Sequence, residues 1–265
     1  MPDGGIHEPD RREGRQLAFV EWNQIFTAEH SEYAVKGLIP KPGLTVLWGP
    51  PKSGKSFLAL DIALAVTRGV EWRGLRTNTA SCLYIAGEGQ GGYGARIDAY
   101  REAHLAEGAD PLPFVLMPER LDLIADHALL IRQVRERLPE TPGLVVLDTL
   151  NRTLSGSEND PADMAKYVGA ADRIRDAFGC AVLVVHHCGI EGTRPRGHTS
   201  LTGAADAQIS VKKDEGGIVT ATVEAMKDWP EGGAFFSRLR GVEVEKDEDG
   251  DAITSCVIEA VDQDE

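Results

Sequence analysis

A glycine-rich loop that holds two lysines and two serines is the part of this sequence best suited to chemistry. Residues 49–56 match the pattern G-x-x-x-x-G-K-[ST], which surrounds phosphate groups with backbone N–H donors. Gly54 permits the tight turn that such a loop needs. The residues predicted to contact a nucleotide are Gly49, Pro50, Pro51, Lys52, Ser53, Gly54, Lys55, Ser56 and Phe57.

Two side chains of this loop have distinct roles in that chemistry. Lys55 is long enough to reach the β- and γ-phosphates, and the Ser56 hydroxyl is a ligand for Mg²⁺. Residues 44–48 read as a buried strand and residues 56–66 as a helix, whose positive end would face the phosphates. A glycine-rich turn that arose by chance would not need to lie between a strand and a helix. Because this loop does, we predict that it binds ATP with Mg²⁺.

Two acidic residues follow strands that are predicted to end near this loop. Residues 80–86 and 144–147 are the strands, and they lead into Glu88 and Asp148 respectively. Parallel sheets bind ligands at the carboxyl ends of their strands, so both acids are expected beside the phosphates. Asp148 is predicted to hold the water shell of Mg²⁺. Glu88 is either the group that orients the attacking water or a solvated loop residue.

A further predicted strand, residues 181–185, ends in the triplet His186, His187 and Cys188. Adjacent histidines on a strand point to opposite faces, so we do not expect a zinc site here. We predict instead that His187, nearer the strand end, senses the γ-phosphate and passes its state to the next loop. His186 is interpreted as a packing group.

The segment that follows, residues 189–203, is the most basic stretch of the predicted core and is rich in glycine. Three interpretations of it stay open. The segment contacts nucleic-acid phosphates in a pore, it carries an arginine that reaches the nucleotide of a neighbouring subunit, or it is a solvated loop.

The pattern along the chain predicts an α/β fold with a mostly parallel central sheet flanked by helices. Helices are expected over residues 95–105, 121–138 and 160–178. From residue 207 the alternation has period two, which favours antiparallel strands over residues 208–211, 218–224, 235–244 and 253–261. We expect a partly disordered N-terminal segment, residues 1–35, and one domain, residues 36–265. Residues 17–28 are apolar enough to pack on the core or to bridge to a neighbouring subunit.

Composition narrows the possible classes of protein. The chain has 265 residues and a net charge of −14, which argues against a generally basic nucleic-acid binder. Ten acids and one lysine lie in the last 25 residues, so the remainder is only mildly acidic and a local basic path stays possible. Four scattered cysteines and the lack of an export signal or a long apolar run predict a cytoplasmic protein with reduced thiols and no membrane segment.

Taken together, these stretches resemble the RecA-like core of P-loop NTPases. More narrowly, they are similar to the single-domain AAA family ATPases typified by the plasmid replicative helicase RepA. The likeness covers about residues 37–233, and the pair of histidines and the position of Glu88 favour this group. The stretches that carry it are residues 49–56, 84–88, 146–152 and 184–187.

The resemblance implies a homo-hexameric ring with ATP and Mg²⁺ bound between subunits, acting on single-stranded DNA. It implies Glu88 as the catalytic base and a strand-end histidine as the sensor, with His187 preferred to His186. Arg196 and Lys227 are the candidates for completing a neighbour's site. A nucleotide-dependent regulatory or recombination-mediator ATPase without unwinding activity is the alternative, and a small-molecule kinase is a weaker third.

Overall fold

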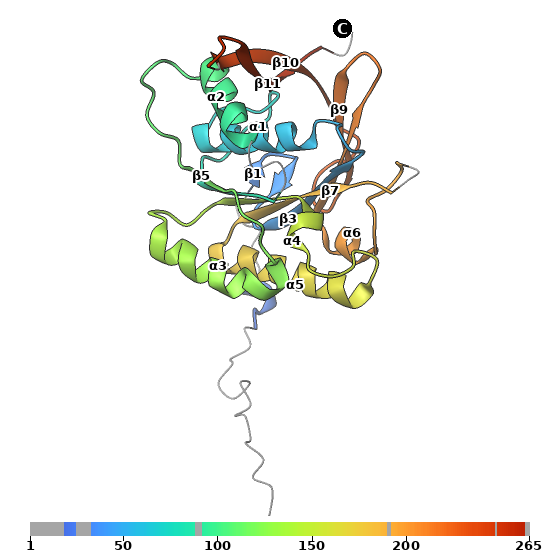
Figure 1. Cartoon of the computed structure of the whole chain (residues 1–265). Helices are drawn as coiled ribbons and strands as arrows, with labels where there is room; N and C mark the ends of the chain where they lie inside the picture. Colours follow the sequence, from blue (N-terminus) through green and yellow to red (C-terminus); the bar gives the residue numbers. More distant parts are fainter. Residues whose placement is uncertain (1–18, 25–32, 88–91, 190–191, 247, 263–265) are drawn as a thin grey trace, which may run out of the picture. The chain divides into compact units, whose positions relative to one another are not determined.

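The structure is a computed structural model that describes residues 19–24, 33–87, 92–189, 192–246 and 248–262 (Figure 1). The chain divides into two units, Met1–Ser31 and Glu32–Glu265. In the described part of the first unit, one 3-10 turn, η1 (Trp22–Gln24), is present, and Phe19, Val20 and Trp22 are exposed. The rest of the apolar segment predicted at residues 17–28 lies outside the described residues.

A nine-stranded sheet organises the second unit. Six neighbouring strands are parallel, and three more continue the sheet in antiparallel pairs. A separate hairpin, β1 (Tyr33–Val35) and β2 (Ile39–Pro40), precedes it. In spatial order the strands of the sheet are β11 (Ala252–Ala260), β10 (Ala234–Lys246), β9 (Ile218–Met226), β8 (Ala207–Lys213), β3 (Gly43–Gly49), β7 (Ala181–His187), β6 (Leu144–Asp148), β4 (Cys82–Ala86) and β5 (Phe114–Met117).

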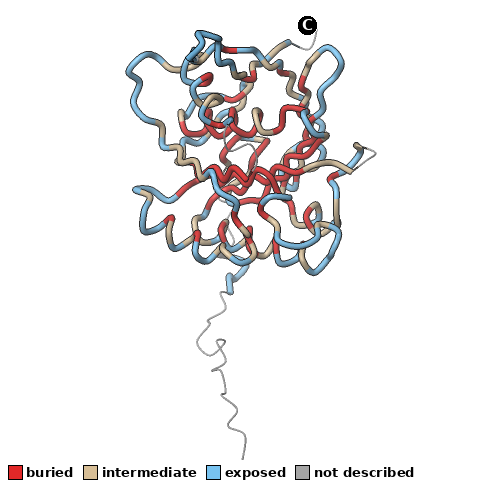
Figure 2. The backbone as a smooth tube through the Cα atoms, viewed as in Figure 1, coloured by how far each residue is buried: buried red, intermediate tan, exposed pale blue. Residues whose placement is uncertain are grey.

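Helices cover both faces of the parallel strands, and successive side chains of each strand pack alternately against the helices of one face and of the other. In β6, Leu144 and Val146 pack in one hydrophobic cluster, and Val145 and Leu147 pack in the other. Figure 2 shows the buried residues concentrated in these central strands and in α1. The first face carries α1 (Lys55–Arg68) and α2 (Tyr93–His104); the second carries α3 (Leu123–Arg137), α5 (Pro161–Phe178) and the short helices α4 (Leu150–Thr153) and α6 (Ser200–Ala204).

Helix α1 is buried on nearly all sides, which its almost uniformly apolar sequence requires. The parallel sheet covers one side of the helix. The β10–β11 hairpin covers another, through Val242, Val257 and Ile258. Figure 1 shows this hairpin lying across α1 and α2. The predicted antiparallel C-terminal strands are therefore part of the core that holds α1. Within the residues described, none of the helices combines the length and apolarity needed to cross a bilayer.

The predicted antiparallel pairing of residues 208–211 is confirmed, because β8 pairs antiparallel with β9, with Gln208 opposite Ala225 and Val211 opposite Ala221. On its other side β8 runs parallel to β3, with Thr45 opposite Ala207 and Trp48 opposite Ser210. The segment between β7 and β8, which includes α6, returns the chain so that β8 begins at the same end of the sheet as β3. A period-two pattern shows which side chains share a face, but it does not show this second, parallel pairing.

An ion pair inside the first hydrophobic layer ties the C-terminal hairpin to α1. The Arg73 guanidinium lies 3.1 Å from the Asp61 carboxylate of α1, and both side chains are nearly buried. The same guanidinium donates to the Ser237 hydroxyl on β10 and to the carbonyl of Ile258 on β11. Trp72 donates a further hydrogen bond to Asp61. Burial raises the pKa of Asp61, and the nearby Arg73 charge opposes that rise.

We expect Arg73→Ala to lower the free energy of unfolding by about 3 kcal/mol, because it leaves the buried Asp61 carboxylate without its counter-charge. Urea denaturation measures this loss. Arg240→Ala is the matched control, because its ion pair with Glu259 on the same hairpin is exposed and should contribute less than about 1 kcal/mol. Equal losses of unfolding free energy in the two variants would contradict a stabilising role for the buried Arg73–Asp61 ion pair.

Candidate active site

The glycine-rich loop connects the end of β3 to the start of α1, as predicted. Gly54 precedes the helix with φ at 93°, a left-handed conformation that glycine adopts without strain. Lys52 also has a positive φ, 62°. The first N–H groups of α1 have no partner within the helix by geometry, so they face the loop. The helix therefore presents its positive end to any anion in this loop.

The loop is closely fitted to its surroundings. A Cβ at Gly49 would collide with the carbonyl of Val211, and a Cβ at Gly54 would lie 3.2 Å from the Val219 side chain. The Ser53 hydroxyl is buried and has no hydrogen-bond partner among the described residues. Lys55 is also buried, and its Nζ donates to the carbonyl of Pro50 at 2.6 Å across the loop. A curled loop of N–H donors, one buried ammonium and one unpartnered hydroxyl suits a polyphosphate.

The residues that would hold Mg²⁺ already contact each other. Asp148 is fully buried at the end of β6, and its Oδ1 accepts a hydrogen bond from the Ser56 hydroxyl at 3.2 Å. Both groups are hard oxygen donors of the kind Mg²⁺ prefers. The predicted pair therefore fits the ion: Ser56 would ligate it and Asp148 would hold its water shell. When bound, the ion would neutralise charge on the β- and γ-phosphates.

Two tyrosines that the sequence reasoning missed complete this contact. The hydroxyls of Tyr84 and Tyr93 both donate to Oδ2 of Asp148, at 2.7 and 2.6 Å. Both tyrosines are buried. Burial raises the pKa of each hydroxyl, and the Asp148 charge raises it further. The phenols are therefore permanent donors to the carboxylate. One signal was present in the sequence: a tyrosine inside an apolar strand needs a partner for its hydroxyl.

Glu88, the predicted base, lies outside the described residues. The residue before it, Gly87, donates its backbone N–H to the carbonyl of Asp148 at 2.7 Å. Register agrees, because Ala86 at the end of β4 is opposite Asp148. The strand that leads into Glu88 thus ends beside the Ser56–Asp148 pair, and the role of Glu88 stays a prediction.

The histidine strand ends beside the glycine-rich loop. His187 lies opposite Gly49 in the parallel pairing of β3 and β7, and Cys188 donates its N–H to the Gly49 carbonyl. His186 is fully buried, and its Nε2–H donates to the Arg196 carbonyl at 2.8 Å. Burial lowers the pKa of His186, which favours the neutral ring. His186 therefore has a structural role in tethering the next loop, beyond simple packing.

The basic segment is held against the rest of the chain. The Arg196 guanidinium forms an ion pair with Glu158, and its second contact with that carboxylate is 3.1 Å. Its backbone N–H donates to the His187 carbonyl. The N–H of His198 donates to the Glu158 carbonyl at 2.7 Å. In this conformation Arg196 is bound within its own chain, at the same end of the strands as the glycine-rich loop.

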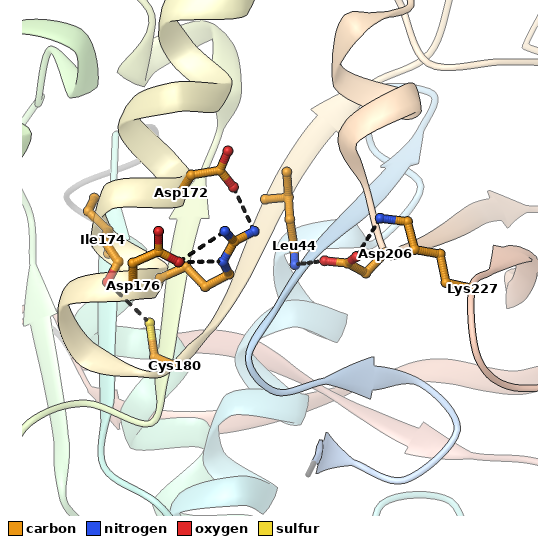
Figure 3. Close-up of polar contacts among 8 residues, drawn as sticks. Leu44, Asp172, Ile174, Asp176, Cys180, Asp206 and Lys227 are labelled. Atoms are coloured by element: carbon orange, nitrogen blue, oxygen red, sulfur yellow. Dashed lines mark hydrogen bonds and ion pairs between the residues drawn. The ribbon is translucent and has the colours of Figure 1, made fainter. Parts of the chain in front are cut away.

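Lys227 lies beside Asp206 and Leu44 (Figure 3), at the opposite end of β3 from the glycine-rich loop. Its Nζ forms a 2.7 Å ion pair with Asp206, whose other carboxylate oxygen accepts the N–H of Leu44 at 2.8 Å. Leu44 is at the beginning of β3, and Gly49 is at its end. Five residues of strand separate these points by about 16 Å. The structure therefore does not bring Lys227 to the nucleotide site of its own chain.

This parallel sheet, the loop at the end of β3 and the Ser56–Asp148 pair define a RecA-like P-loop ATPase. A family described as AAA domain matches residues 9–193, more than half of the chain, so the chain belongs to that family. The predicted fold class is confirmed.

Two solved structures show the same fold. The RadB recombinase superimposes with a TM-score of 0.54 at 19% sequence identity, over 76% of this chain and 89% of RadB. The ATPase domain of G40P superimposes with a TM-score of 0.55 at 13% identity, over 74% of this chain and 81% of that chain. At these identities the likeness establishes the fold alone.

Proposed function

We propose that this chain is a Mg²⁺-dependent ATPase that assembles into a hexameric ring and moves along single-stranded DNA as a replicative helicase of the RepA kind. ATP would bind at the glycine-rich loop, with Lys55 on the phosphates and Ser56 and Asp148 toward Mg²⁺. The likeness to the ATPase domain of G40P and to RadB is compatible with this motor and with a recombination mediator.

The observation that carries the proposal is the link from the nucleotide loop to the basic segment. β7 ends beside Gly49, and its last two residues hold Arg196: His186 donates to the Arg196 carbonyl, and the His187 carbonyl accepts the Arg196 N–H. A shift at the γ-phosphate would move β7's end and thereby the segment that carries Arg194 and Arg196. This is a physical route from nucleotide state to a basic surface.

The chemical step that we propose is direct hydrolysis. Glu88 would accept a proton from water as the water oxygen bonds to the γ-phosphorus, and the bond to the β-phosphate oxygen would break with ADP leaving. His187 would contact the γ-phosphate. Lys55 lies in the glycine-rich loop and would stabilise the charge that develops on the phosphate oxygens.

Arg196 and Lys227 enter the proposal as residues that act on a neighbour. Lys227 lies at the end of the strands far from its own glycine-rich loop, so any role of Lys227 at a nucleotide would be at that of another subunit. Arg196 would first have to exchange its ion pair with Glu158 for a phosphate of the adjoining subunit. Such an arginine stabilises transferring phosphoryl groups in related chemistry.

The experiment that tests the proposal is the ATPase rate per subunit against protein concentration, with and without single-stranded DNA. We expect the rate to rise with concentration, because neighbouring subunits complete each site, and to rise again with DNA. A tailed duplex in the same reactions should be unwound. A substantial rate with neither dependence would contradict the ring motor, and DNA-stimulated hydrolysis without unwinding would favour the recombination-mediator alternative.

A further inference from the structure

The Asp148 carboxylate has its two oxygens engaged on different sides. Oδ1 faces Ser56 at the start of α1, and Oδ2 accepts both phenol hydroxyls. A carboxylate with a single donor can rotate about its Cβ–Cγ bond. Two short hydrogen bonds to one oxygen, from β4 and from α2, restrict that rotation and keep Oδ1 directed at Ser56.

Tyr93 is also held from its other side. The Arg96 guanidinium lies over the Tyr93 ring, with Cζ 4.8 Å from the ring centroid, and over the Phe57 ring at 4.5 Å. Phe57 is in the first turn of α1, next to Ser56. These contacts hold the Tyr93 ring against the first turn of α1, the helix that follows the glycine-rich loop. Its ring also packs against Tyr84, with centroids 5.4 Å apart.

We propose that Tyr93 and Tyr84 are positioning residues for the metal site, holding Asp148 so that Oδ1 is presented to Ser56 and to the water shell of Mg²⁺. This inference rests on the proposed nucleotide site and adds two residues that its motifs do not contain. Because Tyr93 begins α2, directly after the segment that includes Glu88, displacement of the start of α2 would also displace the carboxylate. Metal binding and the position of α2 are thus coupled through one hydroxyl.

The test measures metal binding directly. Mn²⁺ replaces Mg²⁺, a non-hydrolysable ATP analogue is present, and free Mn²⁺ is followed by electron paramagnetic resonance. We expect Tyr93→Phe to raise the Kd for Mn²⁺ about 10-fold, and Tyr84→Phe to raise it in the same direction, as for other partners of metal ligands. Affinity for a fluorescent ATP analogue in EDTA should stay at the wild-type value in both variants.

Tyr100→Phe is the matched control, because Tyr100 is on the same helix but its hydroxyl accepts from Arg68. It should bind Mn²⁺ as the wild type does. Wild-type Mn²⁺ affinity in both Tyr93→Phe and Tyr84→Phe overturns the inference. So does an equal loss of metal-free nucleotide affinity, which would mean that the phenols shape the nucleotide pocket. Thermal unfolding without ligand checks that each variant is folded.

The same titration separates this inference from the proposed function. If the wild type shows no Mn²⁺-dependent binding of the analogue, the nucleotide site itself is contradicted. If the wild type binds and the tyrosine variants match it, only the positioning role fails. A wild type that binds metal but neither assembles nor responds to DNA contradicts the ring motor and leaves the role of the tyrosines intact.

Discussion

Lys55→Ala is expected to lower ATP turnover by about 1,000-fold or more, because no other group in the loop can replace its charge on the β- and γ-phosphates. Lys55 is buried, with its Nζ against the Pro50 carbonyl, so it is already placed over the loop. An exposed lysine nearby could not occupy that position without rearranging the loop. Steady-state phosphate release at saturating ATP and Mg²⁺ measures the effect.

The matched control for this substitution is Lys166→Ala. Lys166 is exposed on α5 and forms a surface ion pair with Asp163, so its removal should leave turnover unchanged and should change the free energy of unfolding by less than about 0.5 kcal/mol. Thermal unfolding should show that Lys55→Ala is folded. Turnover by Lys55→Ala close to that of the wild type would contradict the assignment of the loop.

Asp148→Asn should have the second largest effect, a fall of about 100-fold or more in Mg²⁺-dependent turnover. An asparagine keeps one acceptor oxygen but presents N–H groups on its other side. Either Ser56 or the pair Tyr84 and Tyr93 would then lose its acceptor, and the negative charge that holds the water shell of Mg²⁺ would be gone. The measurement is turnover against Mg²⁺ concentration, together with nucleotide affinity in EDTA, which should be retained.

Asp61→Asn controls for the loss of a buried carboxylate as such. Asp61 is also buried and also on the first face of the sheet, but it pairs with Arg73 and Trp72, away from the loop. Both variants should be less stable than the wild type, because each leaves hydrogen-bond donors without a full acceptor. Only Asp148→Asn should change the Mg²⁺ dependence. The same change in both variants would make the metal effect a consequence of general destabilisation.

Several features of the site follow from short stretches of sequence. The glycine-rich loop needs a strand before it and a helix after it, and residues 44–66 supply both. Asp148 and His187 end apolar runs that are typical of strands buried on both faces. Since parallel strands bring their carboxyl ends to one edge, the meeting of these residues was predictable from the pattern alone.

The second neighbour of β8 and the enclosure of α1 were not predictable in this way. The alternating pattern predicted the antiparallel pairing of β8 with β9, but it does not show that β8 also runs parallel to β3. The apolar sequence of α1 indicates burial on all sides, yet it does not say that β10 and β11 form the second cover. These outcomes depend on contacts between distant segments.

The sequence by itself determined the P-loop, the meeting of Ser56 with Asp148 and the α/β class, because each depends on residues adjacent in the chain or on strand ends that parallel pairing must align. Only the tertiary structure decided the partners of the charged and polar side chains. Tyr84 and Tyr93 reach Asp148 from 64 and 55 residues away, Arg196 is held by Glu158, and Lys227 is held at the far edge by Asp206. A hydrogen bond requires its two atoms to lie within about 3 Å of each other. No spacing rule in the sequence predicts such a contact between groups so far apart in the chain, because the packing of the helices on the sheet decides which of them meet.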